Sequence, residues 1–239
     1  LGLPTSPFAT WAEGDGHGDA FATMLPGHEG PFVVKPVHGR ASVLVEIAET
    51  RADLPRVAAA VAASSGAVAL IEPFLAGAEY CVSVMGPAIC RGGAVEVREA
   101  PFVFSSIERL LPRGERISPS LDRKPITPDS YRVLNAAGAL GARAELAAIA
   151  AAIYARLRLD SIVRVDLRRD AAGRMMVLEA NPKPDLKRPD GKTTSLVCAG
   201  LPEHGMSYED LILSILVNRL ADYIFRIPKA APHLLEMVR

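Results

Sequence analysis

Apolar and polar positions along the chain group into short alternating runs and a few longer periodic segments. In the N-terminal third, runs rich in β-branched residues predict strands. An alanine-rich run with a proline near its start predicts a helix at 51–64. The expected strands of this part cover 31–36, 42–47 and 67–75.

The rest of the chain mixes expected strands and helices without strict alternation. We expect antiparallel strands within 79–100, joined through Gly86-Pro87, and helices at 142–159 and 207–225. Residues 100–131 are rich in proline, serine and charge and show no clear period, which predicts a long loop that could act as a lid. This order of elements favours the α+β class over one doubly wound sheet.

One hairpin is predicted around the turn Asp170-Ala171-Ala172-Gly173, within 162–181. A turn of two or four residues sets Arg164 opposite Glu179 and Asp166 opposite Val177. A three-residue turn would set Asp166 opposite Leu178. We disfavour that turn because it would break up the wholly apolar face of the hairpin. Strand parity then gives one apolar face, with Val165, Leu167, Met176, Leu178 and Ala180, and one polar face, with Arg164, Asp166, Glu179 and Asn181.

Composition narrows the classes of function. Lys and Arg number 27, as do Asp and Glu, so the formal net charge is zero and no nucleic-acid or membrane partner is indicated. The three cysteines are scattered, which fits buried thiols in a reducing compartment rather than a disulfide framework or a zinc motif. No apolar run reaches the length of a membrane span. We therefore expect a cytoplasmic protein.

The polar face of the hairpin carries the candidate chemistry. Two carboxylates and a carboxamide, from Asp166, Glu179 and Asn181, are hard oxygen donors within reach of one another across two strands. Such donors suit magnesium. The alternative is a solvent-exposed polar face on which Arg164 and Glu179 form a cross-strand ion pair, and the hairpin alone leaves both interpretations open.

Several motifs in order resemble the ATP-grasp superfamily, and within it the D-alanine–D-alanine ligase branch. They are PFVVKP, VHGRAS, LIEPFLAGAEY, SIVRVDL and VLEAN. The resemblance covers nearly the whole chain. We expect the family's N-terminal domain to be missing from it, because the start LGLPTSPF resembles a linker between domains. The resemblance implies an ATP-grasp fold of two α/β lobes with antiparallel sheets that sandwich ATP: a small lobe at 1–75 and a C-terminal lobe at 76–239.

The resemblance also implies roles for individual residues. Lys35 would touch nucleotide phosphates, Ser42 would lie in the loop that covers them, and Arg109 would reach them from the long loop. Glu72, Pro73, Phe74 and Leu75 would line the adenine, and Glu79 would bind the ribose. Two magnesium ions, which manganese could replace, would be held by Asp166, Glu179 and Asn181.

The implied reaction joins a carboxylate to an amine. ATP would phosphorylate a substrate carboxylate, the amine would attack the resulting acylphosphate, and Arg164 would stabilise the oxyanion. The substrates would be small molecules, such as amino acids, and a homodimer is left open. The alternative is a nucleotide-binding regulatory or partner-dependent module with this fold that has lost ligation.

The chain departs from the family's pattern at three places. Arg40, Ala41 and Leu44 replace small residues in the phosphate loop, where Arg40 could clamp a phosphate. Pro73 stands where the family usually has a lysine and cannot donate a hydrogen bond. The segment after Asn181, PKPDLKRPDGKTTSL, is longer than in the family and has Asp185 at the expected glycine. Ser195 and Lys183 are its candidate substrate residues, although a solvated turn explains its basic character better.

Overall fold

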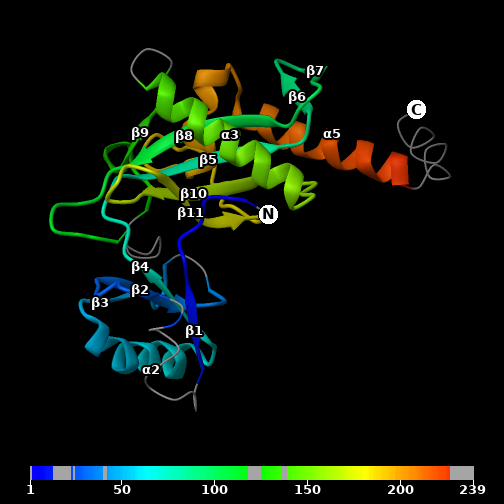
Figure 1. Ribbon diagram of the computed structural model, residues 1–239. Coiled ribbons are helices and arrows are strands. Elements are labelled where there is room, and N and C mark those ends of the chain that lie inside the picture. The colour runs from blue at the N-terminus through cyan, green and yellow to red at the C-terminus, as the bar shows by residue number, and fades with distance from the viewer. Residues whose placement is uncertain are drawn as a thin grey trace.

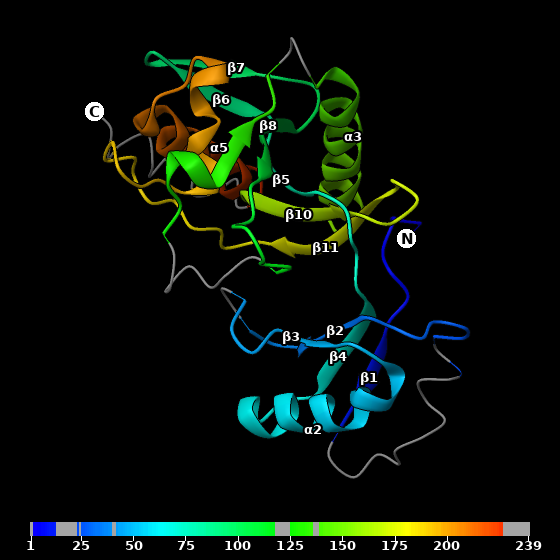
Figure 2. The ribbon, with the colours of Figure 1, turned by 90° about the vertical axis from the view of Figure 1, so that its left-hand side faces the viewer.

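The computed structural model describes residues 2–12, 23, 25–39, 42–117, 125–135 and 139–226. Its strands form a four-stranded sheet, a five-stranded sheet and a separate two-stranded hairpin (Figures 1 and 2). The paired strands are antiparallel, and helices lie against both larger sheets. The predicted α+β class is confirmed.

The four-stranded sheet has the order β1-β4-β2-β3. Its strands are β1 (Ala9–Trp11), β2 (Phe32–Pro36), β3 (Glu46–Ala48) and β4 (Ala69–Pro73). The prediction of a strand at 42–47 is only partly right, because residues 42–44 form a turn in which Ser42 and Leu44 have positive φ angles. A left-handed backbone cannot continue a strand, so β3 starts later.

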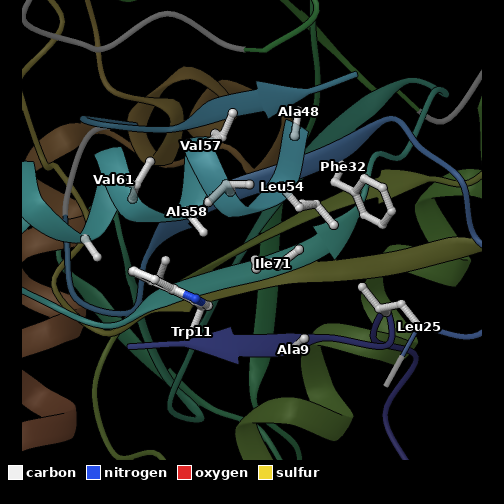
Figure 3. Close-up of a cluster of buried hydrophobic side chains, with 13 residues drawn as sticks. Ala9, Trp11, Leu25, Phe32, Ala48, Leu54, Val57, Ala58, Val61 and Ile71 are labelled. Carbon is white, nitrogen blue, oxygen red and sulfur yellow. The ribbon is translucent and has the colours of Figure 1, made fainter. Parts of the chain in front are cut away.

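The helix α2 (Leu54–Ser65), after the short 3-10 helix η1 (Arg51–Asp53), covers one face of this sheet. Its apolar residues recur at the spacing of one helix face, so a single stripe faces the strands. The helix ends at Gly66, which has a φ of 64° that glycine adopts without strain. Figure 3 shows the resulting core, to which the helix contributes Leu54, Val57, Ala58, Val61 and Ala62 and the strands Ala9, Trp11, Phe32, Val34, Ala48, Ala69 and Ile71.

Removal of the Phe32 ring is expected to destabilise this core strongly. The ring is fully buried, so Phe32→Ala should lower the free energy of unfolding by about 3–5 kcal/mol. Trp11 is the chain's single tryptophan and lies in the same cluster, so its fluorescence during urea unfolding reports on this sheet. Phe8→Ala is the matched control, because Phe8 is 51% exposed and should change stability by at most about 0.5 kcal/mol. Equal midpoints for the two variants would contradict the assignment.

The five-stranded sheet has the order β11-β10-β5-β8-β9 and carries the other large core. Its strands are β5 (Glu79–Met85), β8 (Phe102–Arg109), β9 (Tyr131–Val133), β10 (Val163–Arg169) and β11 (Met175–Asn181). The helix α3 (Leu140–Arg156) packs on one face and buries Leu146, Ala150 and Ile153 against β5 and its neighbours (Figure 1). On the opposite face, Met85, Phe102 and Phe104 of β5 and β8 lie in a further apolar cluster, whereas the part formed by β10 and β11 carries polar side chains.

The strands within 79–100 do not pair as predicted. β5 lies inside the large sheet, whereas β6 (Ala88–Arg91) pairs with β7 (Ala94–Val97) across Gly92-Gly93 and with no other strand of the described residues. The expected hairpin through Gly86-Pro87 is therefore wrong. A Cβ at Gly86 would lie 2.3 Å from the Asn218 side chain, so the chain leaves the sheet here beneath a helix.

That helix, α5 (Tyr208–Arg226), follows two short helices, α4 (Leu196–Ala199) and the 3-10 helix η3 (Leu201–His204). Asn218 accepts a hydrogen bond from the backbone N–H of Ala88 at 3.0 Å, and Ser214 accepts one from that of Cys90 at 2.8 Å. These bonds pair one edge of the β6–β7 hairpin with a helix instead of a strand. No helix in the described part of the chain is both long enough and apolar enough to cross a membrane.

The long loop predicted at 100–131 is wrong over its first third. Residues 102–109 form β8, a central strand of the large sheet, and the short 3-10 helix η2 (Pro128–Ser130) leads into β9. Ser105 has a φ of 49°, and the pairing of β8 with β5 shifts at this point. The bulge breaks the alternation that would have marked the strand. Residues 118–124 lie outside the described part of the chain, so the lid stays a prediction.

His204 makes the stability of this part of the fold sensitive to acid. Its ring lies edge-on to Phe102, with ring centres 5.2 Å apart. Burial, and then the charges of Arg143, Arg91 and Arg98, lower the pKa of His204 to about 4. The native state therefore resists a proton that the unfolded chain takes up near pH 6.5. Stability should be full above that pH and fall as the pH drops toward 4.

We expect the wild type to lose about 1–2 kcal/mol more stability than His204→Gln between pH 7 and pH 4.5. Urea unfolding at the two pH values measures the difference. His38→Gln serves as the control, because His38 is exposed and should leave the pH dependence as it is in the wild type. The same acid sensitivity in His204→Gln and the wild type would refute the role of this ring.

Candidate active site

The hairpin of β10 and β11 sets the register of the candidate site. Asp166 lies opposite Glu179 and Arg164 opposite Asn181, whereas Leu167 already pairs with Val177. The predicted pairs, Arg164 with Glu179 and Asp166 with Val177, are therefore wrong. The strands are joined by residues 170–174, a longer connection than either predicted turn.

A β-bulge explains the difference. Leu178 is the extra residue between the partner of Asp166 and the partner of Leu167, so the alternation along β11 reverses there. Met175 and Val177 consequently pack into the core, in place of the predicted Met176 and Leu178. With the bulge, the two carboxylates lie directly opposite each other while Met175 and Val177 pack into the core.

Four polar side chains meet on one face of this hairpin. The Arg164 guanidinium donates from Nε and Nη2 to the two carboxylate oxygens of Asp166, both at 2.7 Å. The Asn181 carboxamide donates from Nδ2 to Glu179 Oε1 at 2.6 Å and to Asp166 Oδ2 at 3.2 Å. The carboxamide therefore bridges two carboxylates that would otherwise repel each other.

The charges of this face perturb one another. Loss of water from its surroundings, and then the negative charge of Asp166, raise the pKa of the Glu179 carboxyl. Burial opposes the charge of Arg164, but the attraction and hydrogen bonds of Asp166 outweigh it and raise the pKa of that guanidinium. One arginine thus compensates only one of two adjacent carboxylates, which leaves local negative charge that a cation would relieve.

The donor set fits a magnesium ion. Carboxylate oxygens from Asp166 and Glu179 are the donors that magnesium prefers, and the Asn181 carboxamide carries a third oxygen. Within the described residues, no three His, Cys, Asp or Glu side chains gather into a metal site. The carboxamide would therefore be the third protein donor.

The predicted phosphate lysine lies on the other sheet. Lys35 Nζ lies 2.6 Å from Glu72 Oε2, and both side chains are largely buried. Lys35 is on β2 and Glu72 on the adjacent β4, so sheet pairing brings them together. The exposed Ser42 lies in the turn after β2, while Arg40 and Ala41 lie outside the described part of the chain.

Two predicted nucleotide residues of the large sheet also pair with each other. Glu79 is 6% exposed, and its Oε1 lies 2.8 Å from Arg109 Nη1 directly across the strands. Arg168 Nη1 lies 3.8 Å from Glu79 Oε2. Arg168 was missed from the sequence, although its place two residues after Asp166 on the same strand is the signal that could have found it.

The predicted base-binding residues lie at the end of β4 and in the segment that follows it. Pro73 ends β4 opposite Phe32, and Leu75 is buried. The Phe74 ring has the guanidinium carbons of Arg116 and Arg168 at 4.6 and 4.9 Å from its centre. Arg116 is a second residue that sequence reasoning missed, and no local pattern marks it.

The predicted substrate residues differ in exposure. Ser195 is 1% exposed and caps α4, where its hydroxyl accepts a hydrogen bond from the Cys198 N–H at 3.1 Å. Lys183 is exposed at the start of the segment after β11. Further along, backbone N–H groups of Thr193 and Lys192 hold the pKa of Asp190 down at about 2.

The other charges of this segment are partly paired. Lys187 lies 3.7 Å from Asp190, and Arg188 forms an ion pair with Glu209. Such pairing is typical of a self-contained, solvated turn. The other two cations of this segment, Lys183 and Lys192, form no ion pair with a carboxylate of the described residues.

Comparison with known proteins shows what this chain is similar to as a whole. Residues 123–217 match the family model described as D-ala D-ala ligase C-terminus. The D-alanine–D-alanine ligase of Chromohalobacter salexigens is 30% identical over 221 residues, which is 90% of this chain and 60% of that protein. The chain is thus similar to the ATP-grasp region of D-alanine–D-alanine ligases. It spans about three fifths of the length of the curated relatives it matches.

Solved structures support the ATP-grasp fold. The D-alanine–D-alanine ligase of Coxiella burnetii has a TM-score of 0.65 at 16% identity and is covered over 58% of its length by 97% of this chain. The ligase of Bacillus anthracis complexed with ATP also has a TM-score of 0.65, at 18% identity, with 92% of this chain and 62% of that chain covered. At these identities the likeness shows the ATP-grasp fold and leaves the chemistry to the site residues.

Proposed function

We propose that this protein is an ATP-dependent carboxylate–amine ligase that forms an amide through an acylphosphate. The observation that carries the proposal is the polar face of β10 and β11, where Arg164, Asp166, Glu179 and Asn181 meet. Figure 2 supports the arrangement, since β2 and β3 of the small sheet face this hairpin. The nucleotide would lie between a small lobe, residues 1–75, and a larger lobe, residues 76–239.

Magnesium would be held by Asp166, Glu179 and Asn181. When bound, it would neutralise the charge of the nucleotide's β- and γ-phosphates during phosphoryl transfer. The Asn181 carboxamide now presents its NH2 group to both carboxylates. Rotation about its terminal torsion exchanges NH2 for oxygen, so the same side chain can serve as an oxygen donor.

The chain's own residues supply positioning and charge. Lys35, an ammonium on the small sheet, would hold the phosphates across from the hairpin, exchanging its bond to Glu72 for one to the nucleotide. A substrate carboxylate oxygen would attack the γ-phosphorus as ADP leaves. The amine would then attack the acyl carbon, lose a proton and expel phosphate. Arg164 would donate to the oxygen that becomes negative in that step.

A nucleotide-binding module without ligase activity is the second candidate. The segment that would bind the base offers few backbone donors, because Pro73 has no N–H and the Phe74 N–H is donated to the Pro31 carbonyl at 2.9 Å. This favours altered nucleotide affinity or base preference. It is compatible with a protein that binds a nucleotide to regulate a partner.

One experiment separates these functions. The full-length protein is incubated with ATP, magnesium and pooled amino acids, and ADP release and new amide masses are followed. A ligase should release ADP and form an amide together, only when particular amino acids are present. Nucleotide binding without substrate-dependent ADP release would favour the regulatory module. No nucleotide binding at all would refute both.

A further inference from the structure

Arg116 joins three segments that are far apart in the sequence. Its Nη1 lies 2.6 Å from Oε1 of Glu49, which directly follows β3 of the small sheet. Its guanidinium carbon lies 4.6 Å from the ring centre of Phe74, which directly follows β4. Arg116 itself follows β8 of the large sheet. A single side chain therefore links both sheets to the segment between them.

The large-sheet end of this junction is firmly held. The buried Arg168 donates from Nη1 to the Arg116 carbonyl at 2.9 Å and from Nε to the Gly77 carbonyl at 3.0 Å. The Gly77 N–H in turn donates to the Arg169 carbonyl at 2.9 Å, and a Cβ at Gly77 would lie 2.7 Å from that oxygen. The segment after Phe74 is therefore fixed against β10 before any ligand binds.

The small-sheet end of the junction is softer. Glu49 and Arg116 have side-chain exposures of 63% and 40%, and such exposed ion pairs are weak when isolated. Here, however, Arg168 already holds the Arg116 backbone by a hydrogen bond, and the Arg116 guanidinium lies over the Phe74 ring. Less side-chain freedom is lost when the ion pair forms, so the contact is favoured over an isolated one.

We propose that Arg116 is a positioning residue for the nucleotide, a clasp that holds the small sheet and Phe74 at the separation from the large sheet that binding requires. The inference rests on the proposed function, which has the nucleotide contacting both sheets. If only a fraction of the protein has its two sheets at the separation that binding requires, the apparent affinity for the nucleotide is the intrinsic affinity multiplied by that fraction. Preorganisation by the clasp therefore tightens binding without any contact to the nucleotide.

The experiment measures sheet separation and affinity independently. Spin labels at Ser64→Cys on α2 and Ala148→Cys on α3 report the distance between the lobes, and both positions are exposed whereas the three native cysteines are buried. Isothermal titration with magnesium ADP reports affinity. Each measurement is made on the full chain with wild-type Arg116, Arg116→Ala and Arg116→Lys.

Arg116→Ala is expected to broaden the distance distribution without nucleotide and to weaken magnesium ADP binding about five- to tenfold. Arg116→Lys keeps the charge but loses the planar fork, so it should fall between wild type and Arg116→Ala. Glu49→Gln, which removes one arm only, should weaken binding about twofold. Arg113→Ala is the matched control, since Arg113 carries the same charge in the same segment, is exposed and forms no hydrogen bond or ion pair with the described residues.

Three outcomes would overturn the clasp. The first is that Arg116→Ala behaves like Arg113→Ala in both measurements. The second is weaker binding with an unchanged distance distribution, which would make Arg116 a direct contact of the nucleotide. The third is a broadened distribution with unchanged affinity. If the wild type binds no nucleotide but Arg116→Ala still broadens the distribution, the proposed function fails while the clasp between the sheets stands.

Discussion

Glu179→Gln is expected to lower substrate-dependent ADP release at least about 1,000-fold while leaving the protein folded. The substitution removes the negative charge that would share magnesium with Asp166. It keeps the shape of the side chain, and the amide oxygen can still accept from Asn181 as Glu179 Oε1 does at 2.6 Å. Turnover and circular dichroism, measured on the same preparation, test both halves of the expectation.

Stability gives this prediction a second readout. The raised pKa of Glu179 means that the native state disfavours its charge, through dehydration and the proximity of Asp166. A neutral glutamine relieves that repulsion, so the variant should be at least as stable as the wild type without magnesium. Added magnesium should stabilise the wild type more than the variant.

Glu145→Gln provides the control for Glu179→Gln. Glu145 lies on α3, on the other face of the large sheet, and pairs with Arg169 at 2.8 Å. It has a similar charge and no place in the candidate site, so turnover should stay within about twofold of the wild type. Near-normal turnover in Glu179→Gln would remove Glu179 from the metal site.

Sequence periodicity predicted the site hairpin but not its register. Polar and apolar residues alternate on both runs, so parity alone indicated that Arg164, Asp166, Glu179 and Asn181 share a face. The bulge at Leu178 leaves no trace in hydrophobicity, because Val177, Leu178 and Met176 are all apolar. Any of them could pack inward, and only the fit of β10 between β5 and β11 decides which do.

The same limit explains the missed strand β8. Ser105 and Ser106 stand in its middle and read as loop residues, yet both are buried. The Ser105 hydroxyl donates to the Val197 carbonyl at 2.6 Å, a partner 92 residues away. A polar residue can be buried when a distant segment supplies its hydrogen-bond partner. A local sequence pattern does not contain that partner and therefore predicts an exposed residue. Arg116 escaped notice for the same reason, since Glu49 and Phe74 are its neighbours only in the folded chain.

Arg164→Lys is the second substitution with a large expected effect, a fall in amide formation of about 100-fold. Arg164 holds both oxygens of Asp166 through two parallel hydrogen bonds, and a lysine keeps the positive charge but not the fork. Arg164→Ala is less informative, because it would leave the buried Asp166 carboxylate without its cation and destabilise the fold. The lysine variant therefore tests whether a positive charge at this position is enough without the two parallel hydrogen bonds to Asp166.

The expected loss lies in the chemical step rather than in nucleotide binding. If Arg164 donates to the oxyanion formed when the amine attacks, its replacement should lower kcat with little change in the KM for ATP. Arg169→Lys is the matched control, because Arg169 lies on the same strand but pairs with Glu145 on the opposite face. A rise in the KM for ATP at unchanged kcat would instead make Arg164 a nucleotide-binding residue, and normal values of both would exclude it from the site.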